Sequence, residues 1–331
     1  MRFIATALLI LTVIACQKEE PVPQSKKEVT MEYAKELAHK LLIIDTHVDL
    51  PERLINKWED ISQRTENGHV DYPRLVEGGV NAPFMAIYIP ASRDAKGTGK
   101  ELADSLIDMV ESFQTKWPDK FKIVKSQKEV RECFEKGIIA LPLGIENGTA
   151  IKDDIGNLKH FYDRGVRYMT LTHSKNNLLG GSSFDFERTW DGLTDFGKDV
   201  IKEMNHLGMM VDISHVSDST FWDVMKVTKT PPIASHSSCR FFTPGMERNI
   251  SDDMIKAVAE KGGLVMINFG SYFINWEYRE KMDIAWDYVG KHKLQGQERI
   301  DYYKNFKKEN NVPMGTVTEV AAHIKHVADL V

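Results

Sequence analysis

The sequence of 331 residues has few cysteines, no excess of positive charge and no internal repeat. Its three cysteines, Cys16, Cys133 and Cys239, are too few to imply a disulfide framework, although a bridge between the last two stays open. The 43 lysines and arginines are outnumbered by 48 aspartates and glutamates, so nothing indicates a nucleic acid partner. A hydrophobic content of 42% and a charged content of 27% are ordinary for one globular domain.

The N-terminal apolar stretch, residues 3–15, is shorter than the roughly 20 residues of a membrane-spanning helix. It ends in Val-Ile-Ala before Cys16, which resembles a bacterial lipobox and implies cleavage and lipidation at that cysteine. We therefore expect a signal peptide at 1–15, a polar lipid-anchored tether at 16–30 and a single barrel domain at 31–331. The protein would be exported to the bacterial cell envelope and attached to its membrane. An uncleaved signal anchor or an ordinary secretory signal is the alternative.

Four apolar runs in the domain lead directly into residue types that bind metals. Buried parallel strands have such continuous apolar sequences, and in a parallel barrel the chemistry gathers at the C-terminal ends of the strands. Residues that share this position on successive strands converge in space. The run at 41–44 leads to His47 and Asp49, and the run at 138–145 leads to Glu146. The run at 209–214 leads to His215, and the run at 232–235 leads to His236. We predict that these residues form one metal site.

The same runs alternate with segments of helical periodicity, such as 100–117 and 194–207. A strand-then-helix order predicts a parallel sheet covered by helices, an α/β fold. We count about seven strands, whereas a TIM-type (β/α)8 barrel has eight, and expect the eighth strand to be missing from this chain. Residues 272–313 are polar and aromatic, and we expect an insertion there, followed by a capping box at 316–319.

The individual ligand types are weak signals when each is taken alone. His47 and Asp49 lie two residues apart at a strand end, so both side chains point the same way and can bind one ion. Imidazole and carboxylate are ordinary zinc ligands, and a carboxylate at Glu146 could bridge two cations. A lone histidine is more often a hydrogen-bonded core residue, and a lone carboxylate a solvated one. Their shared place at the strand ends is what favours a metal site.

Five short motifs occur in order along the domain. They read DTHVDLP at 45–51, GIENG at 144–148, LTH at 171–173, DISHVS at 212–217 and SHSSCR at 235–240. Together they resemble the membrane dipeptidase family, also called renal dipeptidase, of the amidohydrolase superfamily of metal-dependent barrels. The combination is specific, although no single motif is.

The resemblance implies a binuclear Zn²⁺ site. In that site His47 and Asp49 bind one ion, His215 and His236 bind the other, and Glu146 bridges the two. It also implies that hydroxide formed between the ions attacks the peptide carbonyl of a dipeptide.

The resemblance assigns further roles beyond the metal ligands. His173 matches a histidine that contacts the substrate and stabilises the tetrahedral intermediate, so His173 and Glu146 are the expected catalytic residues. Arg240 matches an arginine that engages the substrate, and a guanidinium suits a carboxylate or an oxyanion. Arg248 and Asn249 also resemble a family dipeptide, for which we expect a structural role only.

One family element is missing from the sequence. The proton-transferring aspartate of the family lies in a Gly-Ser-Asp-Phe-Asp-Gly-like segment on the last strand, and no such segment occurs here. Residues 317–327 resemble the helix before that strand, so we expect a chain truncated before it, with doubtful activity. Two alternatives stay open: another binuclear amidohydrolase acting on a lactone, cyclic amide or ester, and a non-catalytic metal-containing lipoprotein that binds peptides. Assembly as a homodimer also stays open.

Overall fold

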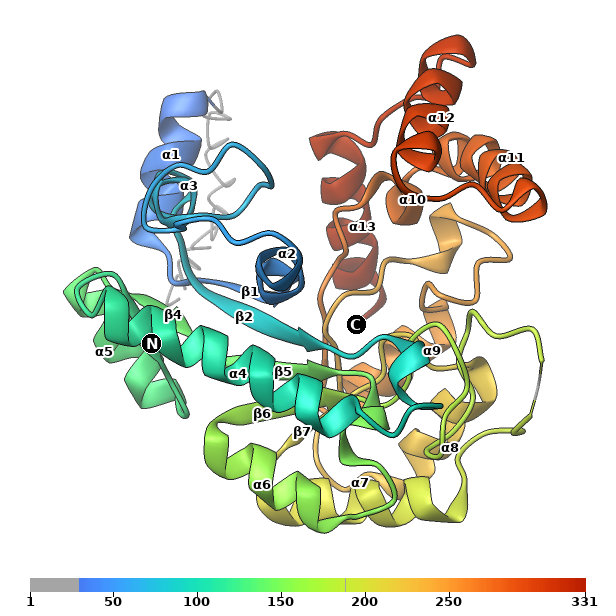
Figure 1. Cartoon of the computed structure of the whole chain (residues 1–331), viewed down its shortest axis with the longest axis horizontal. Coiled ribbons are helices and arrows are strands. Elements are labelled where there is room, and N and C mark those ends of the chain that lie inside the picture. The colour runs from blue at the N-terminus through green and yellow to red at the C-terminus, as the bar shows by residue number, and fades with distance from the viewer. Residues whose placement is uncertain (1–29, 188) are drawn as a thin grey trace, which may run out of the picture.

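The computed structural model describes residues 30–187 and 189–331, so the expected signal peptide and the lipidation site at Cys16 lie outside the described residues (Figure 1). Its centre is a seven-stranded sheet in the order β1-β2-β5-β6-β7-β8-β9, in which all neighbours are parallel. The strands are β1 (Ile43–Val48), β2 (Val80–Tyr88), β5 (Leu143–Glu146), β6 (Val166–Thr170), β7 (Met210–Asp212), β8 (Ile233–Ala234) and β9 (Leu264–Val265). A separate two-stranded sheet pairs β3 (Phe121–Ile123) with β4 (Ile139–Leu141).

Helices α4, α6 and α7 cover the outer face of this curled sheet (Figure 1). Helix α7 begins after the N-cap Thr194, whose side chain accepts from the Gly197 N–H, and ends at the left-handed Gly208. The α-helices are α1 (Met31–Lys40), α2 (Leu50–Asn56), α3 (Tyr72–Gly78), α4 (Gly99–Lys116), α5 (Gln127–Lys136), α6 (Gly156–Arg164), α7 (Asp195–Leu207), α8 (Asp218–Val227), α9 (Asp252–Glu260), α10 (Ser271–Ile274), α11 (Trp276–His292), α12 (Gly296–Glu309) and α13 (Val317–Leu330).

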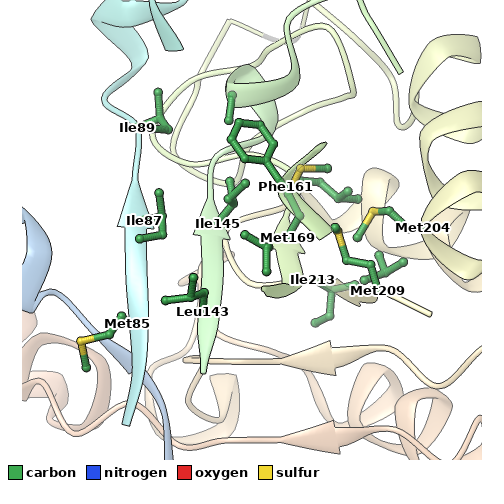
Figure 2. Packing of buried hydrophobic residues seen from close by; sticks show 14 of the residues in the cluster. Met85, Ile87, Ile89, Leu143, Ile145, Phe161, Met169, Met204, Met209 and Ile213 are labelled. Carbon is green, nitrogen blue, oxygen red and sulfur yellow. The ribbon is translucent and has the colours of Figure 1, made fainter. Parts of the chain in front are cut away.

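The core lies between the sheet and these helices. Figure 2 shows Ile87 of β2, and Ile89 just after that strand, beside Leu143 and Ile145 of β5, with Phe161 of α6 packed against them. Because side chains alternate along a strand, the residues between these, including the last residue of β5, face the inside of the curl. The outward layer is thus apolar, and the inward layer is free to carry polar groups.

Gly144 shows how closely the inward layer is packed. A Cβ built on this glycine would lie 2.0 Å from the ring of Tyr168 on the neighbouring strand β6. Only glycine leaves room for that ring to cross β5. The fully buried Tyr168 thereby brings its hydroxyl to the strand ends, where it donates a hydrogen bond to the carbonyl of Thr46 at 2.9 Å.

The prediction of a TIM-type α/β fold is confirmed by this curled parallel sheet. One detail was wrong: the run 138–145, expected as a single strand, forms β4 and β5 in two different sheets. Pro142 separates them, because proline has no N–H to continue a ladder. The expected insertion forms α10, α11 and α12, and the capping box at Thr316 and Glu319 is present.

The sheet does not close into a ring within the described residues. Here β1 pairs only with β2 and β9 only with β8, so two strand edges face each other without a strand between them. Ile44 on β1 and Leu264 on β9 are 43% and 57% exposed, unlike the residues of the central strands. One side of the barrel is therefore closed by paired strands, and the other is open.

Candidate metal centre

The carboxylate of Glu146, the last residue of β5, is the centre of a cluster of imidazoles at the C-terminal ends of the strands. Its Oε1 lies 3.0 Å from Nε2 of His215, 3.3 Å from Nε2 of His236 and 3.5 Å from Nε2 of His173. Its Oε2 lies 3.5 Å from Nε2 of His47. The structure therefore brings these strand-end residues together around one carboxylate.

Asp49 stands at the edge of this cluster. Its Oδ1 lies 3.3 Å from Nε2 of His47, but its side chain is 61% exposed, against 7% for that histidine. Two sets of three residues have ligand atoms that all lie within 4.8 Å of one another: His47, Glu146 and His236, and Glu146, His173 and His215. Asp49 belongs to neither set, so the assignment of ligands to two separate ions stays a prediction.

The donor atoms present fit a divalent cation. The Nε2 atoms of His215 and His236 are 2.9 Å apart, so at most one of them can carry a proton there. On His47, Nδ1 lies 3.2 Å from the hydroxyl of Tyr168, whose proton is already donated to a carbonyl. That hydroxyl must therefore accept from Nδ1–H, so Nε2 is the nitrogen of His47 that faces Glu146 and could bind an ion after losing its proton. Imidazole lone pairs around a shared carboxylate are a donor set for zinc and similar ions.

Charge and burial favour neutral imidazoles at His215 and His236, but a charged one at His47. Burial would raise the pKa of Glu146, but the charge of His47 and hydrogen bonds from His215 and His236 hold it well below its usual value. Burial, followed by the charge of Arg248, lowers the pKa of His215 well below its usual value. Burial and the charges of His47 and Arg248 lower the pKa of His236 to about 4. The pKa of His47 is shifted in the opposite direction. Burial lowers it, but Glu146 and Asp49 raise it to about 10. At neutral pH His215 and His236 are thus uncharged imidazoles, able to bind a metal ion, beside an ionised carboxylate.

The backbone of His215 is strained where it enters the cluster. Its φ is 69°, a left-handed conformation that non-glycine residues rarely adopt. Its carbonyl accepts three hydrogen bonds, from the Ser183 N–H at 2.9 Å, the Ser183 hydroxyl at 3.1 Å and the Thr172 hydroxyl at 3.2 Å. These three donors offset the cost of the strained turn and hold the imidazole over Glu146.

A cavity of about 1010 Å³ opens beside the cluster. At one end it is lined by the ligand-type residues together with Tyr88 and Arg248, and towards the open side of the sheet by apolar residues such as Ile43 and Val265. A space of this size is typical of small-molecule sites, so the ligand-type residues are accessible to a small substrate.

Arg248 is a functional candidate to which the sequence had assigned a structural role only. It is 3% exposed, lines the cavity and donates hydrogen bonds to the Ser237 hydroxyl at 2.8 Å and the His236 carbonyl at 2.9 Å. Its Nε is buried without a hydrogen-bond partner among the described residues. Burial lowers its pKa to about 10, opposed by Glu146, so it stays charged at neutral pH.

Arg240, by contrast, is not brought to the cavity. Its guanidinium forms a two-pronged ion pair with Asp218, at 2.7 and 2.6 Å, and its Nε donates to the Asn249 carbonyl at 2.8 Å. It is absent from the residues that line the cavity. The substrate role expected for Arg240 therefore stays a prediction without support from its position. The Arg-Asn pair at 248–249 was a visible signal for Arg248, but its place in the cavity was not readable from sequence.

A parallel barrel sheet with a buried carboxylate and four imidazoles at its strand ends defines a metal-dependent hydrolase of the TIM-barrel type. The sequence model of the membrane dipeptidases, peptidase family M19, matches residues 31–331, and the chain belongs to this family. It is accordingly a metallo-dipeptidase by family.

The solved structures similar to this chain include the following three. The probable dipeptidase PvdM from Pseudomonas aeruginosa has a TM-score of 0.76 at 19% identity, over 91% of this chain and 83% of that one. A metallo peptidase from Rhodobacter sphaeroides, liganded with a phosphinate mimic of the dipeptide L-Ala-D-Ala, has a TM-score of 0.66 at 24% identity over 81% and 82%. The metallo peptidase called dipeptidase AC has a TM-score of 0.66 at 25% identity, over 81% of both chains.

Proposed function

We propose that this chain is a zinc-dependent enzyme that hydrolyses the peptide bond of dipeptides. In this proposal His47 and Asp49 hold one Zn²⁺, His215 and His236 hold a second, and Glu146 binds both. The observation that carries it is the convergence of four imidazole Nε2 atoms on the Glu146 carboxylate, all within 3.5 Å. A shared, buried carboxylate can bridge a pair of cations.

Bound zinc would polarise the scissile carbonyl and lower the pKa of a water, so that hydroxide is available near neutral pH. The protein groups around it have separate tasks. His173 lies on the cavity wall with its side chain 22% exposed and its Nε2 3.5 Å from Glu146. Burial lowers its pKa, so it is a neutral hydrogen-bond donor suited to the oxyanion that forms on the substrate.

Arg248 is the group that we assign to the substrate carboxylate. A dipeptide carries a carboxylate a few ångströms from its only peptide bond, and a guanidinium binds carboxylates in a fixed orientation. Arg248 lines the same cavity as the cluster and keeps one N–H without a partner among the described residues. This position supports Arg248 over Arg240 for the role.

The test is hydrolysis of L-Ala-D-Ala and L-Ala-L-Ala by the metal-free protein with and without added Zn²⁺. The first peptide is chosen because the Rhodobacter relative is liganded with a mimic of it. We expect activity that a chelator abolishes, and loss of activity in His215→Ala. The control is His206→Ala, which changes an exposed histidine on α7. Activity that survives both chelation and His215→Ala would refute the proposal.

The same assay separates the two alternatives. Turnover of a lactone, cyclic amide or ester panel without turnover of dipeptides would place the chain among other binuclear amidohydrolases. Two bound zinc ions without turnover of any compound would make it a metal-containing peptide-binding protein. We retain dipeptide hydrolysis because the family is a dipeptidase family.

Attachment to the membrane through Cys16 in the cell envelope remains part of the proposal, as does a homodimer. Among residues 30–187 and 189–331, no helix has the length and apolar character needed to cross a bilayer. Mass spectrometry of the N-terminal peptide tests for lipid on Cys16, and a Cys16→Ala chain released from membranes would agree with the anchor. Sedimentation measures the oligomeric state.

A further inference from the structure

The hydroxyl of Ser235 lies between a ligand histidine and a buried carboxylate. Its Oγ is 2.6 Å from Oδ2 of Asp212 and 2.7 Å from Nδ1 of His236. A hydroxyl has one proton to donate and two lone pairs with which to accept. The groups that surround the carboxylate of Asp212 therefore decide which way both of these hydrogen bonds run.

Asp212 is surrounded by donors only. Its Oδ1 accepts from the N–H groups of Ser214 at 3.1 Å and Ser235 at 2.9 Å, and its Oδ2 faces the hydroxyls of Thr170 and Ser235. It is fully buried at the end of β7, and none of the ion pairs among the described residues includes it. Four donors match the four acceptor positions of an ionised carboxylate. The Ser235 proton then points to Asp212, and Ser235 must accept from Nδ1–H of His236.

This arrangement fixes the tautomer of His236. With its proton on Nδ1, the ring has its lone pair on Nε2, which faces Glu146 at 3.3 Å and His215 at 2.9 Å. The support behind the other histidines is different. Nδ1 of His47 lies 3.2 Å from the neutral hydroxyl of Tyr168. The Nδ1 atoms of His173 and His215 are buried without partners among the described residues.

We propose that Asp212 and Ser235 are positioning residues for His236. The Asp212 carboxylate orients the Ser235 hydroxyl, and that hydroxyl accepts from Nδ1–H of His236. The ring is thereby held as the Nδ1–H tautomer, with its Nε2 free for a metal ion. The inference rests on the proposed function, since it takes His236 as a ligand. Outer hydrogen-bond partners of this kind orient a ligand histidine and raise its basicity. Among the described residues, His236 is the one histidine of the cluster with a carboxylate behind its Nδ1 in this way.

The decisive variant is Asp212→Asn, because it reverses the direction of the series. An amide NH₂ in place of Oδ2 donates to the Ser235 oxygen, and the hydroxyl proton turns to Nδ1 of His236. The ring then carries its proton on Nε2, where the lone pair is needed. The matched control is Thr170→Val, which removes the other hydroxyl from the same carboxylate oxygen and leaves Ser235 and His236 untouched.

Zn²⁺ binding to the metal-free proteins is measured by calorimetry, and the histidine tautomers by ¹⁵N NMR of histidine-labelled protein. We expect Asp212→Asn to weaken binding of one ion about 10–100-fold and to move the His236 signals to the Nε2–H tautomer. Thr170→Val should change zinc affinity much less than Asp212→Asn does, and it should leave the tautomer as in the wild type.

Unchanged zinc affinity and tautomer in a folded Asp212→Asn would overturn the inference, and so would an equal loss in Thr170→Val. If Asp212→Asn does not fold, Ser235→Ala decides, because it removes the partner of Nδ1 without removing the carboxylate. Weaker zinc binding in that variant, with mixed His236 tautomers, supports the series, and wild-type values contradict it. A wild-type protein that binds no zinc would instead refute the proposed function, and the inference with it.

Discussion

The closed and open sides of the barrel hold their ligand-type residues in different ways. On the closed side, Glu146 ends one strand that is paired on both flanks and His215 follows another, and their side chains are 4% and 7% exposed. On the open side, Asp49 follows the edge strand β1 and is 61% exposed. Both sides carry residues that the sequence marks equally as ligands. The difference teaches that residue type alone does not determine how firmly a ligand is fixed before a metal binds, because His47 within β1 is 7% exposed whereas Asp49, just beyond that strand, is 61% exposed.

The largest expected effect tests this comparison directly. Glu146→Gln removes the shared charge from the closed side, whereas Asp49→Asn removes a charge from the open side. Because changes at outer partners of a metal already cost about 10–100-fold, we expect Glu146→Gln to lower kcat/KM by more than about 100-fold. Asp49→Asn should cost less, because water already solvates this carboxylate.

Steady-state kinetics and zinc stoichiometry of the two variants provide the measurement, with His206→Ala as the control on α7. A loss in Asp49→Asn equal to or larger than that in Glu146→Gln would break the comparison between the two sides.

A second prediction concerns the packing of the closed side. Gly144→Ala would place a Cβ 2.0 Å from the Tyr168 ring, which two neighbouring strands hold in place. We expect a loss of about 3 kcal/mol in the free energy of unfolding, measured in urea, because overpacking of a rigid core costs about 1–3 kcal/mol. Gly290→Ala is the matched control: nothing lies within 4 Å of the added Cβ on α11, so it should stabilise by about 0.5–1 kcal/mol. Equal effects would mean that the closed side is not rigid.

A third prediction sharpens the comparison with two arginines of one loop region. Arg248→Lys removes a guanidinium from the buried cavity wall, and Arg240→Lys removes one from an ion pair away from it. We expect Arg248→Lys to raise KM for a dipeptide about 10-fold, since hydrogen bonds to charged groups contribute about 1.5–3 kcal/mol. Arg240→Lys should change KM by less. The opposite order would return the substrate role to Arg240.

The smallest expected effect lies on the outer surface of the closed side. Burial would raise the pKa of Asp104 on α4, but hydrogen bonds from Lys100, His160 and Arg164 lower it to about 2. A folded-state pKa below the unfolded value of 3.8 stabilises the protein above about pH 4, and this contribution disappears as the pH falls towards 2. Since the side chain is 26% exposed, Asp104→Asn should cost only about 1 kcal/mol at pH 7.

Urea unfolding of the wild type and Asp104→Asn at a series of pH values is the check. The two curves of stability should approach each other between pH 4 and pH 2. A constant difference across this range would mean that the carboxylate charge contributes nothing.

The sequence predicted the positions of residues wherever a periodic pattern determined the geometry. The runs before His47, Glu146, His215 and His236 are apolar because their strands are buried, and parallel strands bring their ends together. The cluster followed from that rule alone. The break of the run 138–145 at Pro142 was less visible, because the run stays apolar on both sides of the proline.

Positions set by irregular backbone were not predictable in this way. Arg240 and Arg248 lie in one segment after β8, where neither alternation nor helical spacing tells which guanidinium points inward. The same holds for the link from Asp212 through Ser235 to His236, which depends on the hydrogen bonds of a turn and not on a spacing. Local polar geometry, unlike strand burial, leaves no periodic trace.

The two facing strand edges have a consequence for the behaviour of the chain in solution. Along β1 and β9, backbone N–H and C=O groups lack a neighbouring strand within the described residues, and the exposed Ile44 and Leu264 lie on these edges. Such edges are templates for strand addition from another molecule. Concentrated solutions of this chain should therefore lose material through edge-to-edge association, at a rate that rises with protein concentration. A charged residue in place of Leu264 should slow that loss.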